Sequence, residues 1–261
     1  MKSFMDQKRG ILFDFDGVFY VSNQAIDGGP KLIDLLRNKS IPFRFLTNTT
    51  TKTRREIREK LGSFGLLIDE KEIFSAAHIG INYLRSIGSP PCHLLIHDNI
   101  YSDYSEFDVH DRKPEFVVIG DRGNKWNYDD LNKAFRYLME GAGLIALHKG
   151  RYFQTLQGLE IDIGAIIIGL EYSSGQTAIS LGKPNPIFFQ TALEDISIRS
   201  GKAIMVGDDL INDIGGAQRT GMKGVLVRTG KFRKSDLSHS DVKPDFIIES
   251  INELEDILSL I

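Results

Sequence analysis

The sequence of 261 residues is poor in three features that mark particular classes of protein. Its single cysteine, Cys92, cannot form an internal disulfide, and we expect it to be a small packed residue. The formal net charge of -3 provides no broad basic field, which argues against nucleic-acid binding. No apolar run approaches the roughly eighteen residues of a membrane-spanning helix. We therefore expect neither nucleic acid nor a membrane as a partner.

What the sequence does contain is the composition of an ordinary globular protein. Hydrophobic residues make up 41% and charged residues 26%, which suits a sizeable core in one large domain or two smaller ones. Residues 1–10 carry charges and no apolar segment of signal-peptide length. Together with the lone cysteine, this start favours a cytoplasmic protein that binds a small ligand or another protein.

Short apolar runs alternate with helical patterns at both ends of the chain. Strands are predicted at 10–13, 41–46, 178–181, 203–206 and 224–227, with helices between them. Apolar strands separated by helices are typical of a parallel sheet that is covered on both faces. We therefore predict an α/β fold whose core is a Rossmann-like, doubly wound parallel sheet.

The middle of the chain shows the same alternation and exceeds what one compact sheet needs. Strands are predicted at 94–96, 116–119 and 144–147, and helices at 128–139 and 163–172. Ser-Pro-Pro at 89–91 and Gly-Gln-Thr at 175–177 are typical of boundaries. We predict a core of residues 1–86 and 178–261, into which residues 87–177 are inserted as an α/β cap domain.

Polar side chains gather where the predicted strands of the core end. In an open parallel sheet, ligands bind beyond the carboxyl ends of the strands, where the loops converge. We therefore expect these side chains to form one site. They are Asp14, Asp16, Thr47, Asn48, Lys183, Asp208, Asp209 and Asp213.

The carboxylates of this group need a partner of opposite charge. Acidic groups crowded into a partly dry site cannot all stay ionised without a compensating cation. Oxygen ligands with an open coordination position suit Mg²⁺, whereas no cluster of His and Cys has zinc-like spacing. We expect Mg²⁺ as the cofactor.

Four ordered motifs resemble those of the haloacid dehalogenase superfamily. They are Asp-x-Asp-Gly at 14–17, Thr-Asn at 47–48, Lys183 in Gly-Lys-Pro-Asn-Pro, and Gly-Asp-Asp-x-x-x-Asp at 207–213. The predicted insertion is similar to the large α/β (C2-type) cap of the NagD-like branch, which includes pyridoxal phosphate phosphatases. The resemblance covers almost the whole chain and implies a phosphatase, that is, a phosphoric monoester hydrolase.

The resemblance also implies a role for each motif residue. Asp14 would attack phosphorus to give an aspartyl phosphate, while Asp16 would protonate the leaving oxygen and later deprotonate the water. This second acid argues against dehalogenation, because a halide leaves without a proton. Mg²⁺ would be held by Asp14, Asp208 and the backbone carbonyl of Asp16. The phosphate would be bound by Thr47, Asn48 and Lys183.

The substrate and the assembly state follow from the resemblance alone. The stretches 95–98, 149–152 and 228–233 are similar to branch members that cleave pyrophosphate and phosphoramidates. A small phosphate ester is expected, with pyrophosphate, phosphohistidine or phospholysine as the alternative, and relatives suggest a homodimer formed through the cap. A non-catalytic binding protein and a phosphomutase are weaker hypotheses, because every charged motif position is filled and a mutase must return its product for a second transfer.

Several polar residues have two interpretations from sequence alone. Asp213 and Asp209 would either support the metal site or stabilise a helix N-terminus, and the motif favours Asp213. Asp162 would face a substrate or cap the helix that follows it. Lys149, next to His148, would face an anionic substrate or lie in a solvated turn.

Overall fold

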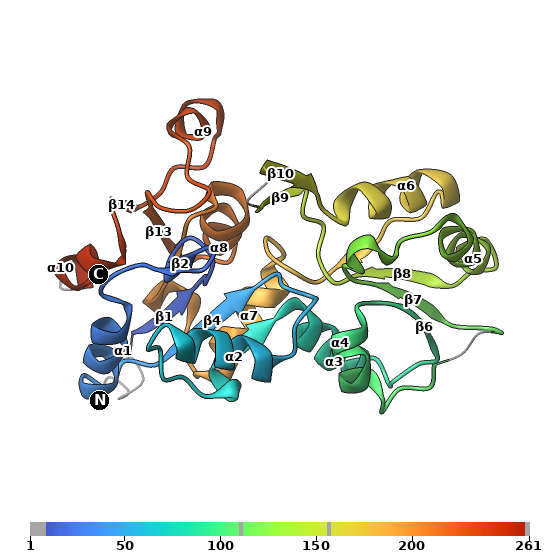
Figure 1. Cartoon of the computed structure of the whole chain (residues 1–261), viewed down its shortest axis with the longest axis horizontal. Helices are drawn as coiled ribbons and strands as arrows, with labels where there is room; N and C mark the ends of the chain where they lie inside the picture. Colours follow the sequence, from blue (N-terminus) through green and yellow to red (C-terminus); the bar gives the residue numbers. More distant parts are fainter. Residues whose placement is uncertain (1–8, 110–111, 156–157, 259–261) are drawn as a thin grey trace. The chain divides into compact units, whose positions relative to one another are not determined.

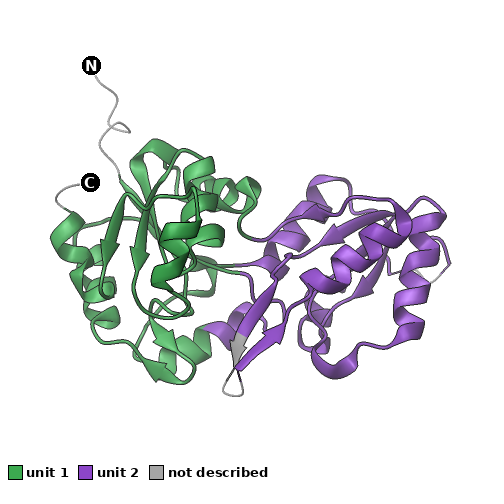
Figure 2. Ribbon diagram, turned by 90° about the horizontal axis from the view of Figure 1, so that it is seen from above, with its two compact units in different colours: residues 1–47, 58–74, 183–261 green, residues 48–57, 75–182 purple. Residues whose placement is uncertain are grey.

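The computed structural model describes residues 9–109, 112–155 and 158–258, which fold into two compact units. Unit 1 comprises residues 1–47, 58–74 and 183–261, and unit 2 comprises residues 48–57 and 75–182 (Figure 2). Each unit has a parallel sheet of its own. The predicted α/β fold is therefore confirmed.

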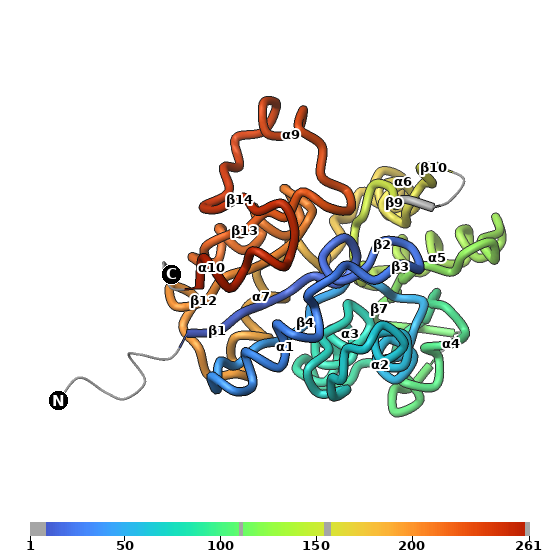
Figure 3. Tube along the Cα trace, turned by 60° about the vertical axis from the view of Figure 1, so that its left-hand side comes forward, coloured from blue at the N-terminus to red at the C-terminus, as the bar shows by residue number. Residues whose placement is uncertain are grey.

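Unit 1 is built on a six-stranded sheet in the order β14-β13-β12-β1-β4-β5. β1 pairs in parallel with β4 on one side and with β12 on the other, so strands from both ends of the chain meet at the centre (Figures 1 and 3). The chain order reverses at β1, which is where ligands bind in such sheets. The strands are β1 (Gly10–Phe13), β4 (Phe43–Thr47), β5 (Ile73–Ser75), β12 (Ala203–Gly207), β13 (Lys223–Val227) and β14 (Phe246–Ile248).

The helices of unit 1 lie on both faces of this sheet (Figures 1 and 2). In α1, Pro30 stands in the first turn and Leu32, Ile33 and Leu36 form the buried face. A π-helix over Leu210–Gly215 continues directly into α8. The helices are α1 (Gly29–Asn38), α2 (Arg54–Ser63, of which 54–57 belong to unit 2), α7 (Pro186–Asp195), α8 (Gly216–Arg219), α9 (Lys234–His239) and α10 (Leu254–Leu258); a hairpin joins β2 (Tyr20–Val21) to β3 (Gln24–Ala25).

Aromatic side chains fill the core beneath β1 and β4. Phe15 stacks on Phe45 with ring centroids 4.8 Å apart, and Phe13 packs against Phe45 and Phe19. Successive residues of an extended strand face opposite sides. Asp14 therefore projects away from the aromatic side, towards the carboxyl edge of the sheet.

Unit 2 is built on a four-stranded parallel sheet in the order β11-β8-β7-β6. Val117, Leu144 and Ile167 belong to its buried core. Its strands are β6 (Cys92–Leu95), β7 (Phe116–Ile119), β8 (Gly143–Ala146) and β11 (Ile179–Ser180), with an antiparallel hairpin of β9 (Tyr152–Thr155) and β10 (Gly158–Ile161); its helices are α3 (Ala76–Ser86), α4 (Asp98–Tyr101), α5 (Tyr128–Met139) and α6 (Gly164–Ser174).

Helix α3 marks the largest difference from the predicted organisation. The Tyr104 hydroxyl donates a hydrogen bond to the Ala77 carbonyl at 2.8 Å, and Gly80 lies against Tyr104 and Leu147. These contacts place α3 in unit 2, so the unit boundary does not coincide with the predicted limit at residue 87. The division into a catalytic core and a cap stays a prediction.

Most predicted elements lie within a few residues of the observed ones. The strands at 10–13 and 116–119 and the helix at 128–139 have the predicted limits. Strand β5 was not predicted, because three residues are too few to show a period. None of the helices in the described parts of the chain combines the length and apolar character that crossing a bilayer requires.

Candidate active site

Strand β1 ends on the first acidic motif, at the centre of the unit 1 sheet. The Asp14 N–H donates to the Val206 carbonyl at 2.9 Å, which continues the pairing of β1 with β12. The chain then turns at Gly17, whose φ is 81°. A Cβ at Gly17 would overlap Asp208 Oδ2. This glycine is therefore required both by the backbone conformation and by the close approach of Asp208.

Lys183 links the beginning of the chain to its last third. Its Nζ lies 2.6 Å from Asp14 Oδ1 and 2.7 Å from Asp213 Oδ1, and it donates to the Leu46 carbonyl at 3.3 Å. Burial disfavours the ammonium, but Asp14 and Asp213 outweigh burial and raise the pKa of Lys183. A buried ion is tolerated when it is paired and hydrogen-bonded in this way.

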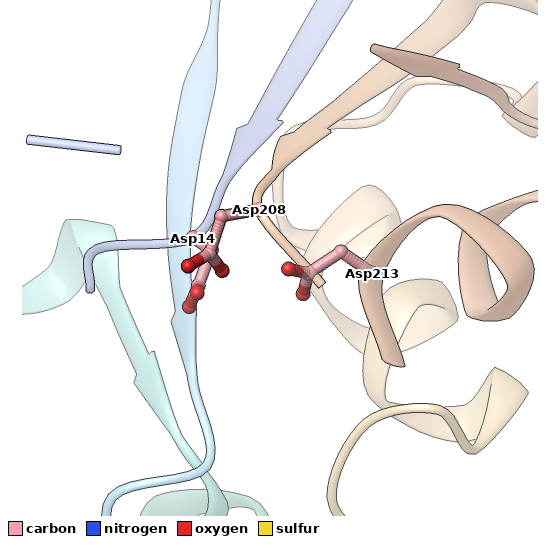
Figure 4. A group of neighbouring side chains, drawn as sticks. All are labelled: Asp14, Asp208 and Asp213. Carbon is pink, nitrogen blue, oxygen red and sulfur yellow. The ribbon is translucent and has the colours of Figure 1, made fainter. Parts of the chain in front are cut away.

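Three buried carboxylates converge at this edge of the sheet. One oxygen each of Asp14, Asp208 and Asp213 lies within 4.8 Å of the other two, and Figure 4 shows the three side chains reaching the same place from separate segments. Burial, together with the neighbouring Asp14, raises the pKa of both Asp208 and Asp213. The cluster therefore lacks enough positive charge to keep all of its members ionised.

The two oxygens of Asp208 differ in their surroundings. Oδ2 accepts the backbone N–H of Lys231 at 2.6 Å. Oδ1 is buried and has no hydrogen-bond partner among the described residues. An unpaired buried oxygen is costly, and a bound cation would satisfy it and offset the neighbouring carboxylates. The donor set of this cluster thus fits a hard metal ion.

Asp209 and Asp213 have different surroundings, although both follow β12. The Asp209 carboxylate caps the π-helix, where Oδ1 accepts the N–H groups of Ile211 and Asn212 at 3.0 and 2.9 Å. Asp213 is fully buried and binds Lys183, and its Oδ2 accepts the Asp209 N–H at 3.1 Å. The structure brings Asp213, and not the side chain of Asp209, into the acidic cluster.

Asp16 is half-buried, unlike the three buried carboxylates, and other groups act on its pKa. Burial, and next the charge of Asp14, raises its pKa, whereas a hydrogen bond from Tyr20 and the charges of Lys60 and Lys231 oppose this shift. A carboxyl group that keeps its proton to higher pH than usual is suited to act as a general acid.

The Thr-Asn motif falls where the two units meet along the chain. Thr47 is the last residue of β4 and is buried, at the same edge of the sheet as Asp14. Asn48 is the first residue of unit 2, where its Oδ1 lies close to Gly182. The predicted phosphate contacts of Thr47 and Asn48 remain predictions.

Two polar residues of unit 2 that have two interpretations from sequence, Lys149 and Asp162, make contacts within unit 2. Lys149 Nζ binds both carboxylate oxygens of Glu171, at 2.8 and 3.0 Å, so its charge is already paired. Asp162 Oδ1 accepts the Ile163 N–H at 2.7 Å and lies 3.8 Å from Nε2 of the buried His148. Asp162 therefore makes a local hydrogen bond at the start of α6.

Three residues near Asp16 and Asp208 were missed from the sequence. Lys231 follows β13, Tyr20 hydrogen-bonds Asp16 through its hydroxyl, and the Lys60 ammonium lies 3.9 Å from the centroid of the Tyr20 ring. Thr-Gly-Lys at 229–231 follows the largely buried strand β13 after one residue, Arg228. A polar segment after an apolar strand is the same signal that identified the other motifs. Tyr20 and Lys60 have no comparable signal.

Comparison with known proteins agrees with this geometry. Residues 11–110 match the family model of haloacid dehalogenase-like hydrolases, and residues 180–254 match the HAD-hydrolase-like model. The chain is 40% identical to human phospholysine phosphohistidine inorganic pyrophosphate phosphatase, over 96% of this chain and 94% of that protein. It is 36% identical to rat haloacid dehalogenase-like hydrolase domain-containing protein 2, over 93% and 92% of the two chains.

A solved structure shows the same fold. The 4-nitrophenylphosphatase of Thermotoga maritima superposes with a TM-score of 0.90 and 26% sequence identity, covering 97% of this chain and 98% of that one. Sequence identity of 40% over nearly the full length, together with this shared fold, establishes the family. The chain belongs to the haloacid dehalogenase-like hydrolases and is an enzyme of that family.

Proposed function

We propose that this chain is a Mg²⁺-dependent phosphohydrolase that acts on a small phosphorylated substrate through an aspartyl phosphate on Asp14. The observation that carries this proposal is the position of the Lys183 ammonium, 2.6 Å from Asp14 Oδ1. A buried cation beside a carboxylate can offset the charge of a phosphoryl group that approaches the same carboxylate. Relatives that are named phosphatases support the same reaction class.

The reaction divides into two transfers of one phosphoryl group. In the first, an Asp14 oxygen forms a bond to phosphorus while the bond to the leaving oxygen breaks, and Asp16 donates its proton to that oxygen. In the second, the Asp16 carboxylate accepts a proton from water, the water oxygen bonds to phosphorus, and the bond from Asp14 to phosphorus breaks. Asp16 is thereby reprotonated and inorganic phosphate leaves.

The residues that would hold Mg²⁺ are Asp14, Asp208 and the backbone carbonyl of Asp16. When bound, Mg²⁺ supplies positive charge to the carboxylates and to the phosphoryl oxygens. Support for this assignment comes from the unpartnered Oδ1 of Asp208 and from the raised pKa of that carboxyl group, which burial and then Asp14 cause. Asp213 would keep Lys183 in place, since its Oδ1 lies 2.7 Å from Nζ.

Two kinds of substrate are candidates for this site. A small phosphate ester suits the 4-nitrophenylphosphatase similarity, whereas pyrophosphate, phosphohistidine or phospholysine suits the 40%-identical human relative, whose name lists these substrates. A panel of phosphorylated metabolites, pyrophosphate and phosphoramidates, assayed for released phosphate with Mg²⁺, separates the two.

The mechanism itself is tested with Asp14→Asn. We expect this substitution to lower kcat for 4-nitrophenyl phosphate by about 10³-fold or more, because the amide is a poor nucleophile, with little change in Tm. Acid-quenched wild-type protein should carry one phosphoryl group by mass spectrometry, and Asp14→Asn none. Asp34→Asn is the matched control, since Asp34 is exposed on α1.

Two results would contradict the proposal. Normal turnover in Asp14→Asn would exclude Asp14 as the nucleophile. Pure wild-type protein that stays inactive on the whole panel with Mg²⁺ would favour a binding protein on the same fold.

A further inference from the structure

A three-residue segment outside the predicted motifs is fixed against both acidic motifs of unit 1. It consists of Thr229, Gly230 and Lys231 and is called the Thr-Gly-Lys segment below. The Thr229 hydroxyl donates to the Gly17 carbonyl, and the Lys231 N–H donates to Asp208 Oδ2 at 2.6 Å. The segment is therefore tied at one end to the turn at Gly17 and at the other end to Asp208 after β12.

Gly230 allows this close packing. A Cβ at Gly230 would overlap Asp208 Oδ2 and the Cα of Gly17, and its φ is 61°. Any larger residue would push the segment away from Asp208. The backbone position of Lys231 beside the cluster is thus set by packing as well as by hydrogen bonds.

The side chain of Lys231 brings a second cation to the acids. Burial opposes its charge, but Asp208, and after it Asp14, Asp209 and Asp213, raise the pKa of the ammonium. Unlike Lys183, Lys231 makes no ion pair and no side-chain hydrogen bond within the described ranges of the chain. The backbone of Lys231 contacts Asp208, its charge acts on the acids, and the residue is exposed, so the ammonium is accessible to a ligand.

Lys231 acts on the same acid as Lys60. Both ammonium groups lower the pKa of Asp16, against the larger effects of burial and Asp14, which raise it. Lys60 is held over the ring of Tyr20, whose hydroxyl hydrogen-bonds Asp16. Asp16 is the proposed donor of a proton to the leaving group, and Lys60 and Lys231 are the cations that act on Asp16, whereas Lys183 binds Asp14.

We propose that Lys231 is a specificity-determining residue that binds negative charge on the leaving group itself. The enzyme would then favour phosphate compounds whose leaving group already carries negative charge in the bound substrate, such as inorganic pyrophosphate, over aryl phosphates. A cation beside that group interacts with phosphate oxygens that the aryl group of an aryl phosphate lacks. This inference rests on the proposed phosphohydrolase function and extends it to a class of substrate.

The test uses Lys231→Met and Lys231→Arg, which both keep the backbone N–H that binds Asp208. With Mg²⁺, Lys231→Met should lower kcat/KM for pyrophosphate by about 10- to 100-fold more than for 4-nitrophenyl phosphate, as expected for one lost charge-assisted contact. Lys231→Arg should keep most of the wild-type ratio of kcat/KM for pyrophosphate to kcat/KM for 4-nitrophenyl phosphate. Lys234→Met is the control, because Lys234 is exposed at the start of α9.

Binding provides a readout that does not depend on turnover. Calorimetric titration with Mg²⁺ and imidodiphosphate, a slowly hydrolysed pyrophosphate analogue, should show about tenfold weaker binding to Lys231→Met than to wild type, with a smaller loss for orthophosphate. Equal losses for both ligands, or equal losses of kcat/KM for both substrates, would overturn the proposal. If wild type binds the analogue but hydrolyses nothing, the proposed function fails while the role of Lys231 is still tested by binding.

Discussion

Replacing Lys183 with Met tests whether the buried pairing of Lys183 with Asp14 and Asp213 stabilises the fold. The substitution keeps the length of the side chain and removes the ammonium, so two buried carboxylates are left facing each other. Asp213 is fully buried and would keep the hydrogen bond from the Asp209 N–H, at 3.1 Å. Removing one partner of a buried ion pair costs about 3–5 kcal/mol in general.

Protonation of Asp213 limits this cost and makes it depend on pH. Burial already raises the pKa of Asp213 while Lys183 opposes the shift, so losing Lys183 raises it further. An unfolded Asp has a pKa of about 3.9, so neutralising Asp213 in the folded state costs about 4 kcal/mol at pH 7 and about 1.5 kcal/mol at pH 5. When folding raises the pKa of a carboxyl group, the free energy of unfolding of the protein falls as the pH rises. Because the pKa of Asp213 in the wild type is already raised to about 7, the wild type bears most of this pH dependence as well. Lys183→Met should therefore be destabilised by only about 0.5 kcal/mol more at pH 7 than at pH 5.

Urea denaturation at pH 5 and pH 7 without divalent ions measures this difference. The double variant Lys183→Met with Asp213→Asn should recover much of the loss at pH 7, because its amide carries no charge. Lys202→Met, at an exposed position, is the control. A loss below about 1 kcal/mol at pH 7, or a loss that is more than about 1 kcal/mol larger at pH 5 than at pH 7, would refute the reasoning.

Three further outcomes are expected. Mg²⁺ should raise Tm more at pH 8 than at pH 5.5, because burial and then Asp14 raise the pKa of Asp208 and protons compete with the metal; equal shifts would contradict this. By urea denaturation, Gly17→Ala should lose about 2 kcal/mol or more, because φ is 81° and a Cβ would overlap Asp208, whereas Gly62→Ala, with open space around it, should lose nothing. Tyr172→Glu, at a side chain that is 90% exposed on α6, should weaken the predicted homodimer in light scattering, and wild type that stays a monomer would remove the dimer hypothesis.

Much of the candidate site could be predicted because local patterns and one rule of sheet geometry are enough to bring its residues together. Asp14 and Asp208 each follow an apolar run of strand length, and parallel strands bring their carboxyl ends to one edge. The pairing of β1 with β12 makes these two ends neighbours. Thr47 reaches the same edge through the pairing of β1 with β4.

The choice between Asp209 and Asp213 needed the tertiary structure. Both residues follow β12 within one helical turn, and both fit the pattern of a helix N-terminus. Only the observed hydrogen bonds separate them: Asp209 caps the π-helix, while Asp213 turns inward to Lys183. The position of Lys183 depends on how distant segments pack, which no local pattern encodes.

By itself the sequence determined the α/β fold, the order of the acidic motifs and the strand ends that carry them. The spacing of apolar residues and the positions of turn residues are local properties of the sequence, so they can be read without the structure. Only the tertiary structure decided that α3 packs in unit 2, that Lys183 pairs with both Asp14 and Asp213, and that the Thr-Gly-Lys segment lies against Asp208. These contacts join residues far apart in the chain. They depend on packing and on the direction of individual side chains, and these arise only when the whole sheet has formed.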